Sequence, residues 1–156
     1  MVLAVGGVYV FIFRVDRDIR TTIGSLGSVH LVHGVYGYVG SARGAGGVRA
    51  RVLHHIRKEK RRVWWHIDYL TTLPETVPMY VVYAKTSCDV ESLLAHRIGL
   101  SPCWSGYTRG FGSSDKDSYT HLYLCSCSEE LCIDSIAEAF SAIGLEPIVE
   151  KVDDII

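Results

Sequence analysis

The alternation of apolar and polar positions along the chain predicts several short strands. Val8–Phe13 is apolar on both faces and rich in branched and aromatic residues, which is typical of a buried strand. Further along, positions Tyr36, Tyr38 and Gly40 share one face by period-two alternation. The other predicted strands are a short one after a polar turn within Val15–Ile23, then Ser28–Val32, Val35–Ser41, Trp64–Leu70, Val77–Ala84, His121–Cys127 and Pro147–Val152.

Helical periodicity follows a glycine-rich loop at Ala42–Gly47 and predicts a helix over Gly47–Arg61. Its apolar stripe consists of Val48, Val52 and Ile56. A second set of positions, spaced i, i+3, i+4 and i+7, carries basic or imidazole side chains on a neighbouring face. These residues are Arg51, His54, His55 and Lys58.

Two more helices and one long loop complete the pattern. Asp89 is predicted to cap a helix that runs through Ile98 and stops at Gly99. Glu130–Ile143 is amphipathic, whereas Ser101–Ser118 lacks periodicity and is predicted to be a loop. Because helices and strands alternate around short turns, residues 1–156 are predicted to form one α+β domain with its own core.

Charge is unevenly distributed although the net charge of the chain is only −1. Between Arg43 and Arg62, eight Lys or Arg residues stand against Glu59 alone, while from Glu129 onward eight acidic residues stand against Lys151. A cluster of one sign indicates a phosphate-bearing partner. Charge alone leaves open the alternative of a solvated helix face that the acidic tail offsets.

The cysteines leave two redox states open. The chain has five cysteines and neither Asn nor Gln, and depletion of these amides is a trend of hyperthermophile proteins. Intracellular disulfides occur in such organisms, whereas free thiols are expected in other cytosolic proteins. An odd number leaves at least one thiol unpaired within the chain. Cys125-Ser126-Cys127 has no partner pair at zinc-finger spacing, so a structural zinc is not expected.

The apolar N-terminus is predicted to be a core strand rather than a signal peptide. It lacks a basic leader, and Arg14, Asp16 and Arg17 interrupt it. No stretch approaches the ~20 apolar residues of a membrane span. We therefore expect a soluble, cytoplasmic protein.

Five residues in two short tyrosine motifs and two predicted helices suit phosphodiester chemistry. A hard divalent ion held by one carboxylate neutralises charge and activates water, with waters and phosphates completing its shell. An arginine fork binds phosphate, and a tyrosine near positive charge can act as a base. Taken singly, each residue also has a structural explanation. The tyrosines can be ordinary strand aromatics, and the Arg and His can belong to a solvated helix face. The Glu can be a first-turn residue that the helix dipole favours. The five residues are Tyr9, Tyr38, Arg51, His55 and Glu91.

The order and spacing of these residues resemble the GIY-YIG endonuclease superfamily. Gly7-Val8-Tyr9 matches the first motif and Tyr38-Val39-Gly40 the second, with valines in place of the isoleucines. The resemblance implies a small, mostly antiparallel sheet flanked by helices and a site that uses Mg²⁺ or Mn²⁺. It also implies that Tyr9 and Tyr38 position or deprotonate water, Arg51 binds the scissile phosphate, His55 takes the tyrosine-or-histidine slot and Glu91 holds the metal. Gly40 would let the backbone pass close beneath the site.

More of the chain, roughly residues 6 to 125, resembles one uncharacterised branch of that superfamily, a domain of unknown function. The segments that carry this resemblance are Gly34–Ala42, Trp65–Leu70, Glu91–Ala95 and Gly110–Leu122. The chain departs from the branch in the last segment, where Lys116 and Ser118 stand in place of two usual cysteines. A metal or redox role of those cysteines is therefore absent here.

Residues near these segments extend the predicted substrate-binding set. His66, Asp68, Asp115 and His121 form a possible second cluster, which can bind metal, relay protons or line a substrate pocket. A buried histidine held by an aspartate is the structural alternative, which the residues by themselves favour. Ser113 and Ser114 can donate hydrogen bonds to phosphate or simply form a turn. The full predicted substrate-binding set is Gly40, Ser41, Arg43, His54, Lys58, His66, Asp68, Ser114 and His121.

The sequence leaves three functions open. The resemblance favours a divalent-metal-dependent nuclease that acts on DNA or, as the second choice, RNA. A non-catalytic module that binds nucleic acid through Arg43–Arg62 is the alternative, with affinity that falls steeply with salt. A hydrolase of small phosphoesters or nucleotides is the third, because fold alone does not determine chemistry.

Overall fold

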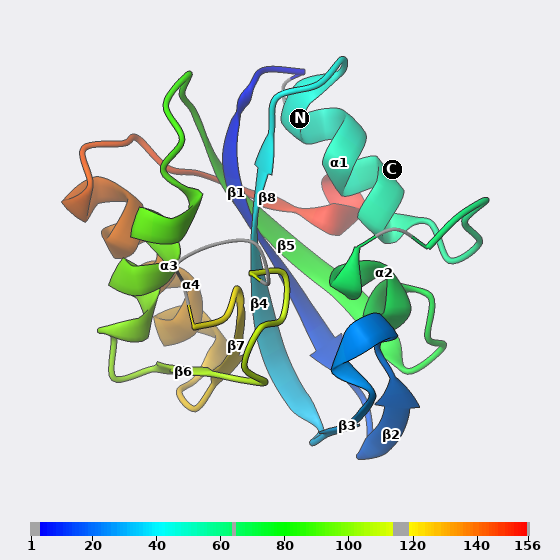
Figure 1. Ribbon diagram of the computed structural model, residues 1–156. Coiled ribbons are helices and arrows are strands. Elements are labelled where there is room, and N and C mark those ends of the chain that lie inside the picture. Colours follow the sequence, from blue (N-terminus) through cyan, green and yellow to red (C-terminus); the bar gives the residue numbers. More distant parts are fainter. Residues whose placement is uncertain (1–3, 64, 114–118, 156) are drawn as a thin grey trace.

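An antiparallel sheet forms the centre of the fold (Figure 1), in a computed structural model that describes residues 4–63, 65–113 and 119–155. Within these residues the sheet has six strands, and every neighbouring pair is antiparallel. In spatial order they are β6 (Trp104–Gly106), β7 (Leu122–Cys125), β4 (Gly34–Ala42), β1 (Gly7–Val15), β5 (Thr76–Lys85) and β8 (Ile148–Lys151). A separate hairpin, β2 (Ile19–Thr22) and β3 (Ser28–Leu31), lies between β1 and β4 in the sequence.

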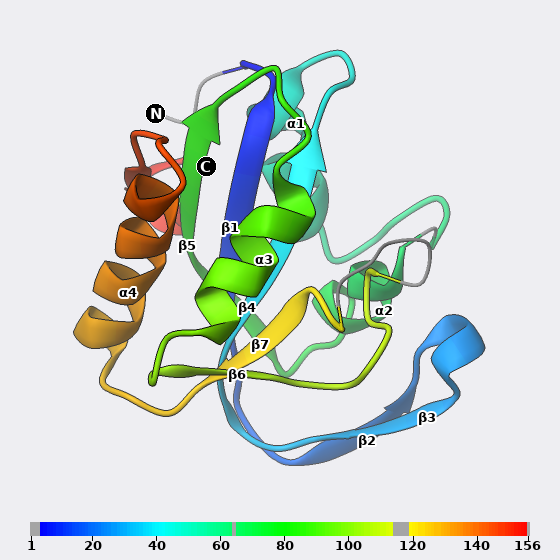
Figure 2. The same ribbon diagram turned by 60° about the vertical axis from the view of Figure 1, so that its left-hand side comes forward.

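Helices cover both faces of the sheet. They are α1 (Gly47–Ile56), α2 (His66–Thr71), α3 (Glu91–Gly99) and α4 (Glu129–Ala142). Figures 1 and 2 show α1 and α2 together on one face, and α3 and α4 on the other. A short 3-10 helix at Val152–Asp154 follows β8. The predicted α+β class, with a small antiparallel sheet flanked by helices, is confirmed.

Strand β1 is apolar on both faces because each face meets a separate core. Tyr9, Phe11 and Phe13 pack in the cluster that includes side chains of α1 and α2. Val8, Val10 and Ile12 pack in the cluster with residues of α3 and α4. All six positions are buried. Alternate side chains of these six residues therefore point into two separate cores, and neither face of this stretch meets solvent.

The predicted boundaries of most elements agree with the structure. Strands β1 to β5, β7 and β8 overlap the predicted strands, and α4 begins one residue earlier than expected. Ser128 accounts for that start, because its hydroxyl accepts a hydrogen bond from the N–H of Leu131 at 3.3 Å and caps the helix.

The prediction for the basic helix was wrong at its end, because α1 stops at Ile56 rather than Arg61. Arg57 is already extended, with φ −71° and ψ 120°. Beyond Ile56 the stripe has no apolar residue at the next helical positions, and extension would place like charges of Arg57 and Arg61 one turn apart. Neither burial nor electrostatics favours further helix.

The prediction of a strand over Trp64–Leu70 was also wrong, since residues 66–71 form the helix α2. The carboxylate of Asp68 accepts the backbone N–H of Trp65 at 3.1 Å and so closes the first turn. Ile67, Leu70 and Thr71 are buried at helical spacing i, i+3 and i+4. Apolar and polar residues also alternate in this segment, and a helix of only six residues is too short to show its own period clearly.

Two smaller expectations also need correction. Asp89 does not cap α3, whose N-cap is Val90 without a side-chain hydrogen bond. The exposed carboxylate of Asp89 instead lies 3.5 Å from a guanidinium nitrogen of Arg43. The predicted loop after residue 101 contains the short strand β6, in which buried Trp104 pairs opposite Cys125 of β7.

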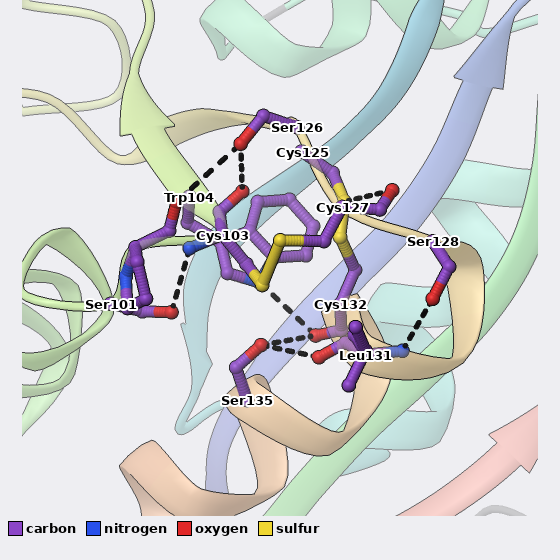
Figure 3. The surroundings of a disulfide bond; sticks show 11 residues. Ser101, Cys103, Trp104, Cys125, Ser126, Cys127, Ser128, Leu131, Cys132 and Ser135 are labelled. Atoms are coloured by element: carbon purple, nitrogen blue, oxygen red, sulfur yellow. Dashed lines mark hydrogen bonds between the residues drawn. A yellow bond between two sulfur atoms is a disulfide. The ribbon is translucent and has the colours of Figure 1, made fainter.

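Four of the five cysteines form two disulfides at the end of the sheet where β6, β7 and α4 meet (Figure 3). Cys103 is bonded to Cys127, and Cys125 to Cys132. Cys88 is an exposed free thiol, so the predicted unpaired cysteine is confirmed. Among the described residues, no helix has the length and apolar character needed to cross a membrane.

Candidate functional site

The register of β1 against β4 places the two motif tyrosines side by side on the α1 face. Tyr9 is opposite Gly40, and Phe11 is opposite Tyr38. The ring of Tyr9 lies over Gly40, where a Cβ atom would stand 2.5 Å from the Tyr9 hydroxyl oxygen. The missing side chain of Gly40 therefore makes room for the tyrosine.

Helix α1 adds two more residues of the motif set above these strands. Val48, Val52 and His55 are its buried residues apart from Gly47, so His55 belongs to the apolar stripe and not to a solvated basic face. His55 is only 1% exposed. Its Nε2 lies 2.7 Å from the hydroxyl oxygen of Tyr9, and the ring of Tyr38 meets its ring edge-on at 5.8 Å.

Burial shapes the protonation of this pair. Burial, followed by the charges of His54, Lys60 and Arg51, lowers the pKa of His55 well below its ordinary value, so the imidazole is neutral. Burial likewise raises the pKa of Tyr9 well above its ordinary value, while Arg51 opposes that shift. The pair is thus a neutral hydrogen-bonded couple at neutral pH.

The unpaired nitrogen of His55 indicates which way the hydrogen bond runs. Within the described part of the chain, Nδ1 is buried without a hydrogen-bond partner. A buried unpaired N–H is rarer and less favourable than a buried unpaired lone pair. The favoured tautomer therefore carries its proton on Nε2 and donates it to Tyr9, which leaves the tyrosine's own O–H free to donate to another acceptor.

Glu91 reaches the same region from the opposite side of the sheet. Pairing of β4 with β7 ends at Tyr38, and α3, which begins at Glu91, contacts β4. The carboxylate is nearly buried, and one of its oxygens lies 3.9 Å from Nδ1 of the fully buried His121. The strand pairing and the start of α3 together bring a carboxylate to the tyrosines.

These residues share one cleft of about 240 Å³. The walls contain all five residues of the tyrosine, arginine, histidine and glutamate set, with Ser41 and Gly40 from the predicted substrate-binding set. The complete lining is Tyr9, Tyr38, Gly40, Ser41, Arg51, His55, Trp65, Glu91 and Gly112.

Sequence reasoning missed Trp65 and Gly112 as residues of the cleft. The guanidinium carbon of Arg51 lies 4.2 Å from the centroid of the Trp65 ring, a cation–π contact that orients the arginine. Gly112 has φ +66°, and a Cβ there would stand 3.0 Å from the Tyr38 ring. An aromatic residue beside a basic run was a usable signal for Trp65, whereas the close approach at Gly112 exists only in three dimensions.

Two basic residues of the predicted substrate-binding set do not line the cleft. The Nζ atom of Lys58 donates hydrogen bonds to the backbone carbonyls of Leu73 at 2.7 Å and Thr76 at 2.5 Å. It therefore ties the end of α1 to the connection between α2 and β5. Arg43 faces Asp89 across 3.5 Å at an exposed position.

The second predicted cluster is divided among separate partners. Asp68 is fully buried and binds Nε2 of His54 at 2.9 Å while it also closes the first turn of α2. The backbone N–H of Gly112 donates to Nδ1 of His66 at 2.8 Å, which positions the loop that borders the cleft. Both contacts are structural in kind, and His121 lies beside Glu91. Ser114, Asp115, Lys116 and Ser118 lie outside the described residues.

The donor atoms of the cleft suit one hard cation held mainly by Glu91. Within the ranges 4–63, 65–113 and 119–155, no group of three or more His, Cys, Asp or Glu side chains is arranged to hold a metal ion. Magnesium does not need such a cage, because one carboxylate with waters and substrate phosphates can complete its shell. The carboxylate and the two tyrosine hydroxyl groups are hard oxygen donors of that type.

Comparison with known proteins identifies the family of the chain. Neither the curated proteins nor the solved structures contain a match. The model of one family matches residues 8–145, a span that contains both motif tyrosines and every residue that lines the cleft. The chain belongs to this family, described as domain of unknown function DUF123.

Proposed function

We propose that the protein is a divalent-metal-dependent nuclease of the GIY-YIG type, which hydrolyses phosphodiester bonds in DNA or, as the second choice, RNA. The observation that carries the proposal is the single cleft in which Tyr9, Tyr38, Arg51, His55 and Glu91 converge. They come from β1, β4, α1 and α3, so their meeting is a property of the fold. Each has an ordinary structural explanation alone, but those explanations do not account for one shared opening.

Arg51 is suited to bind the scissile phosphate. Its planar fork can form two parallel hydrogen bonds to phosphate oxygens, and it stays charged at any physiological pH. The stacked ring of Trp65 limits its motion, so less side-chain entropy is lost when it binds. Mg²⁺ or Mn²⁺ at Glu91 would neutralise phosphate charge and favour ionisation of water and of the leaving oxygen.

Tyr9 is suited to accept a proton from the attacking water. Its phenolate is disfavoured by burial but favoured by Arg51 and by an N–H donated from His55. In the proposed step, which uses the ionised fraction of Tyr9, the water oxygen bonds to phosphorus, its proton passes to the Tyr9 phenolate, and the bond from phosphorus to the leaving sugar oxygen breaks. Solvent then protonates the leaving oxygen, and Tyr38 orients the water from the neighbouring strand.

A module that only binds nucleic acid is the second candidate, because one observation favours it. A hollow of about 700 Å³ adjoins the cleft at Trp65 and is lined otherwise by basic or imidazole side chains. Phosphate contacts of this kind give salt-dependent binding without any cleavage. The hollow contains His54, Arg57, Lys60, Arg61, Arg62 and Trp65.

The deciding experiment incubates the purified protein with Mg²⁺ or Mn²⁺ and plasmid, duplex, flap, junction and RNA substrates. We expect cleavage by the wild type and its loss in Glu91→Ala and Arg51→Ala. The exposed residues Glu146 and Arg97 provide matched controls, and Glu146→Ala and Arg97→Ala should cut normally. Normal cutting by both cleft variants would show that the site is wrong. Salt-sensitive binding without any cutting would instead establish the binding module.

A further inference from the structure

Trp65 separates the cleft from the neighbouring basic hollow, so both spaces share its indole ring. It lines the cleft with Arg51, and it also lines the hollow with Arg57 and Arg61. Its exposed fraction is 38%, high for the largest apolar side chain. A ring with this position offers apolar surface at the junction of two polar spaces.

Two contacts hold the indole in place, one of them over a face of the ring, while 38% of the residue stays exposed. The guanidinium of Arg51 lies 4.2 Å from the ring centroid, and the imidazole of His54 meets the ring edge-on with centroids 5.5 Å apart. His54 is itself fixed by its hydrogen bond to the buried carboxylate of Asp68. The ring is therefore oriented before any ligand arrives, which reduces the entropy lost on stacking.

The two spaces differ in the size of group that they can accept. Ligand pockets for whole small molecules are usually about 300–1,000 Å³. The cleft, at about 240 Å³, falls below that range and suits a phosphate with its waters. The hollow, at about 700 Å³, lies within the range and can take a sugar and base. A nucleotide whose phosphate binds at Arg51 can therefore place its sugar and base beyond Trp65, in the hollow.

The charge of the hollow favours a polyanion over a single nucleotide. Arg57, Arg61 and Arg62 are exposed, and Lys60 is half-buried among them. Burial first, and also the charges of Lys58 and Arg57, lower the pKa of Lys60 despite the opposing effect of Asp68. Negative charge in the hollow would relieve this repulsion. Four cations exceed what one phosphate monoester needs.

We propose that the protein binds an unpaired stretch of nucleic-acid strand whose backbone runs from the cleft into the hollow, with one base stacked on Trp65. This inference rests on the proposed nuclease function, because it defines the substrate of the same site. Stacking on an aromatic ring requires a base with an open face, and duplex bases are covered by their neighbours. Substrates with single-stranded segments therefore fit the site better than continuous duplex.

The test measures binding without metal, so that cleavage does not interfere. The probes are fluorescein-labelled oligothymidylate of about 12 nucleotides, a typical single-strand site size, an abasic strand of equal length, the matching duplex, and oligouridylate to distinguish RNA from DNA. Trp65→Ala should weaken oligothymidylate binding about tenfold, or ~1.4 kcal/mol, and Trp65→Phe should restore most of it. Trp65→Ala should weaken binding of the abasic strand clearly less than that of oligothymidylate, because stacking needs a base and only the orientation of Arg51 is lost for the abasic strand.

A second measurement tests the basic hollow. For single strands, each lost phosphate contact reduces the slope of log affinity against log salt by about 0.7. We expect that reduction in Arg57→Ala and in Arg61→Ala, but not in Arg97→Ala, whose side chain lines a different hollow beside α4. Thymidine monophosphate should compete only weakly with the strand.

The outcomes separate this inference from the nuclease proposal. If Trp65→Ala weakened binding of the abasic strand as much as binding of oligothymidylate, the ring would only orient Arg51, and stacking would be overturned. Duplex preference or full competition by thymidine monophosphate would also overturn it. If stacking is found but the wild type cuts nothing with Mg²⁺ or Mn²⁺, the proposed hydrolysis fails and the strand site stands. If the wild type cuts and Trp65→Ala binds the strand normally, the proposed hydrolysis stands and the stacking on Trp65 fails.

Discussion

Tyr9 and His55, 46 residues apart in the sequence, share a buried hydrogen bond of 2.7 Å between the tyrosine oxygen and Nε2. Tyr9 comes from the central strand and His55 from the helix that covers it. Because both groups are buried, a change in the protonation of either one affects both folding and the proposed chemistry.

Acid should destabilise the fold through His55. Its folded-state pKa lies below the ordinary value of 6.5, so the unfolded chain binds more protons as the pH falls below about 6.5. Neutral His55 contributes fully to the free energy of unfolding above that pH. As the pH is lowered, this free energy falls by up to about 1.4 kcal/mol per pH unit. Urea unfolding from pH 7 to 5 measures the slope. His55→Gln should flatten it, whereas His30→Gln, at an exposed position on β3, should not.

Cleavage should accelerate with pH if Tyr9 is the base. Its raised pKa means that the phenolate fraction increases about tenfold per pH unit below that pKa. Single-turnover rates from pH 6 to 9 should rise with a slope approaching one. Tyr9→Phe should lower the rate by about 10²–10⁴-fold and remove this dependence. A wild-type profile that is flat across the range would exclude the assignment.

Gly40→Ala should damage both the fold and the cleft. The new Cβ would lie 2.5 Å from the Tyr9 oxygen and 2.6 Å from the adjoining ring carbon. Overpacking of this kind costs about 1–3 kcal/mol, and each kcal/mol lowers the melting temperature by about 2–4 °C in a chain of this size. Thermal unfolding measures the loss.

A matched control and a rescue make the Gly40 prediction specific. Gly44→Ala should leave the melting temperature nearly unchanged, because nothing lies within 4 Å of its Cβ position. Tyr9→Phe removes the closest atom, so the double variant with Gly40→Ala should lose less stability than the two single changes added together. Strict additivity would mean that the predicted contact does not exist.

Loss of the disulfides should lower stability without disturbing the cleft. Cys103 and Cys127 are separated by 24 positions, for which loop closure predicts about 3–4 kcal/mol. The paired variant Cys103→Ala/Cys127→Ala should therefore melt at a lower temperature, while Cys88→Ser should not. Because neither residue of this disulfide lines the cleft, cleavage well below the melting temperature should be unchanged. An equal melting temperature for all three proteins would contradict the pairing.

The sequence was most informative where one local pattern determines which side chains share a face. Alternation along Val8–Phe13 identified the central strand, and both of its faces proved to be buried. The same logic failed at residues 66–71, because a six-residue helix is too short to display its period. Helical periodicity likewise predicted that α1 continues past Ile56, where it in fact ends. Basic residues are good helix formers, but like charges one turn apart repel each other.

By itself, the sequence determined the α+β class, the position of most strands and helices along the chain, and the set of five candidate residues. Only the tertiary structure decided that these five share one cleft, that His55 is buried against Tyr9, and that Trp65 stacks on Arg51. The reason is physical. Local spacing selects a face of a strand or helix, whereas desolvation, hydrogen-bond partners and pKa values depend on what another part of the chain packs against that face.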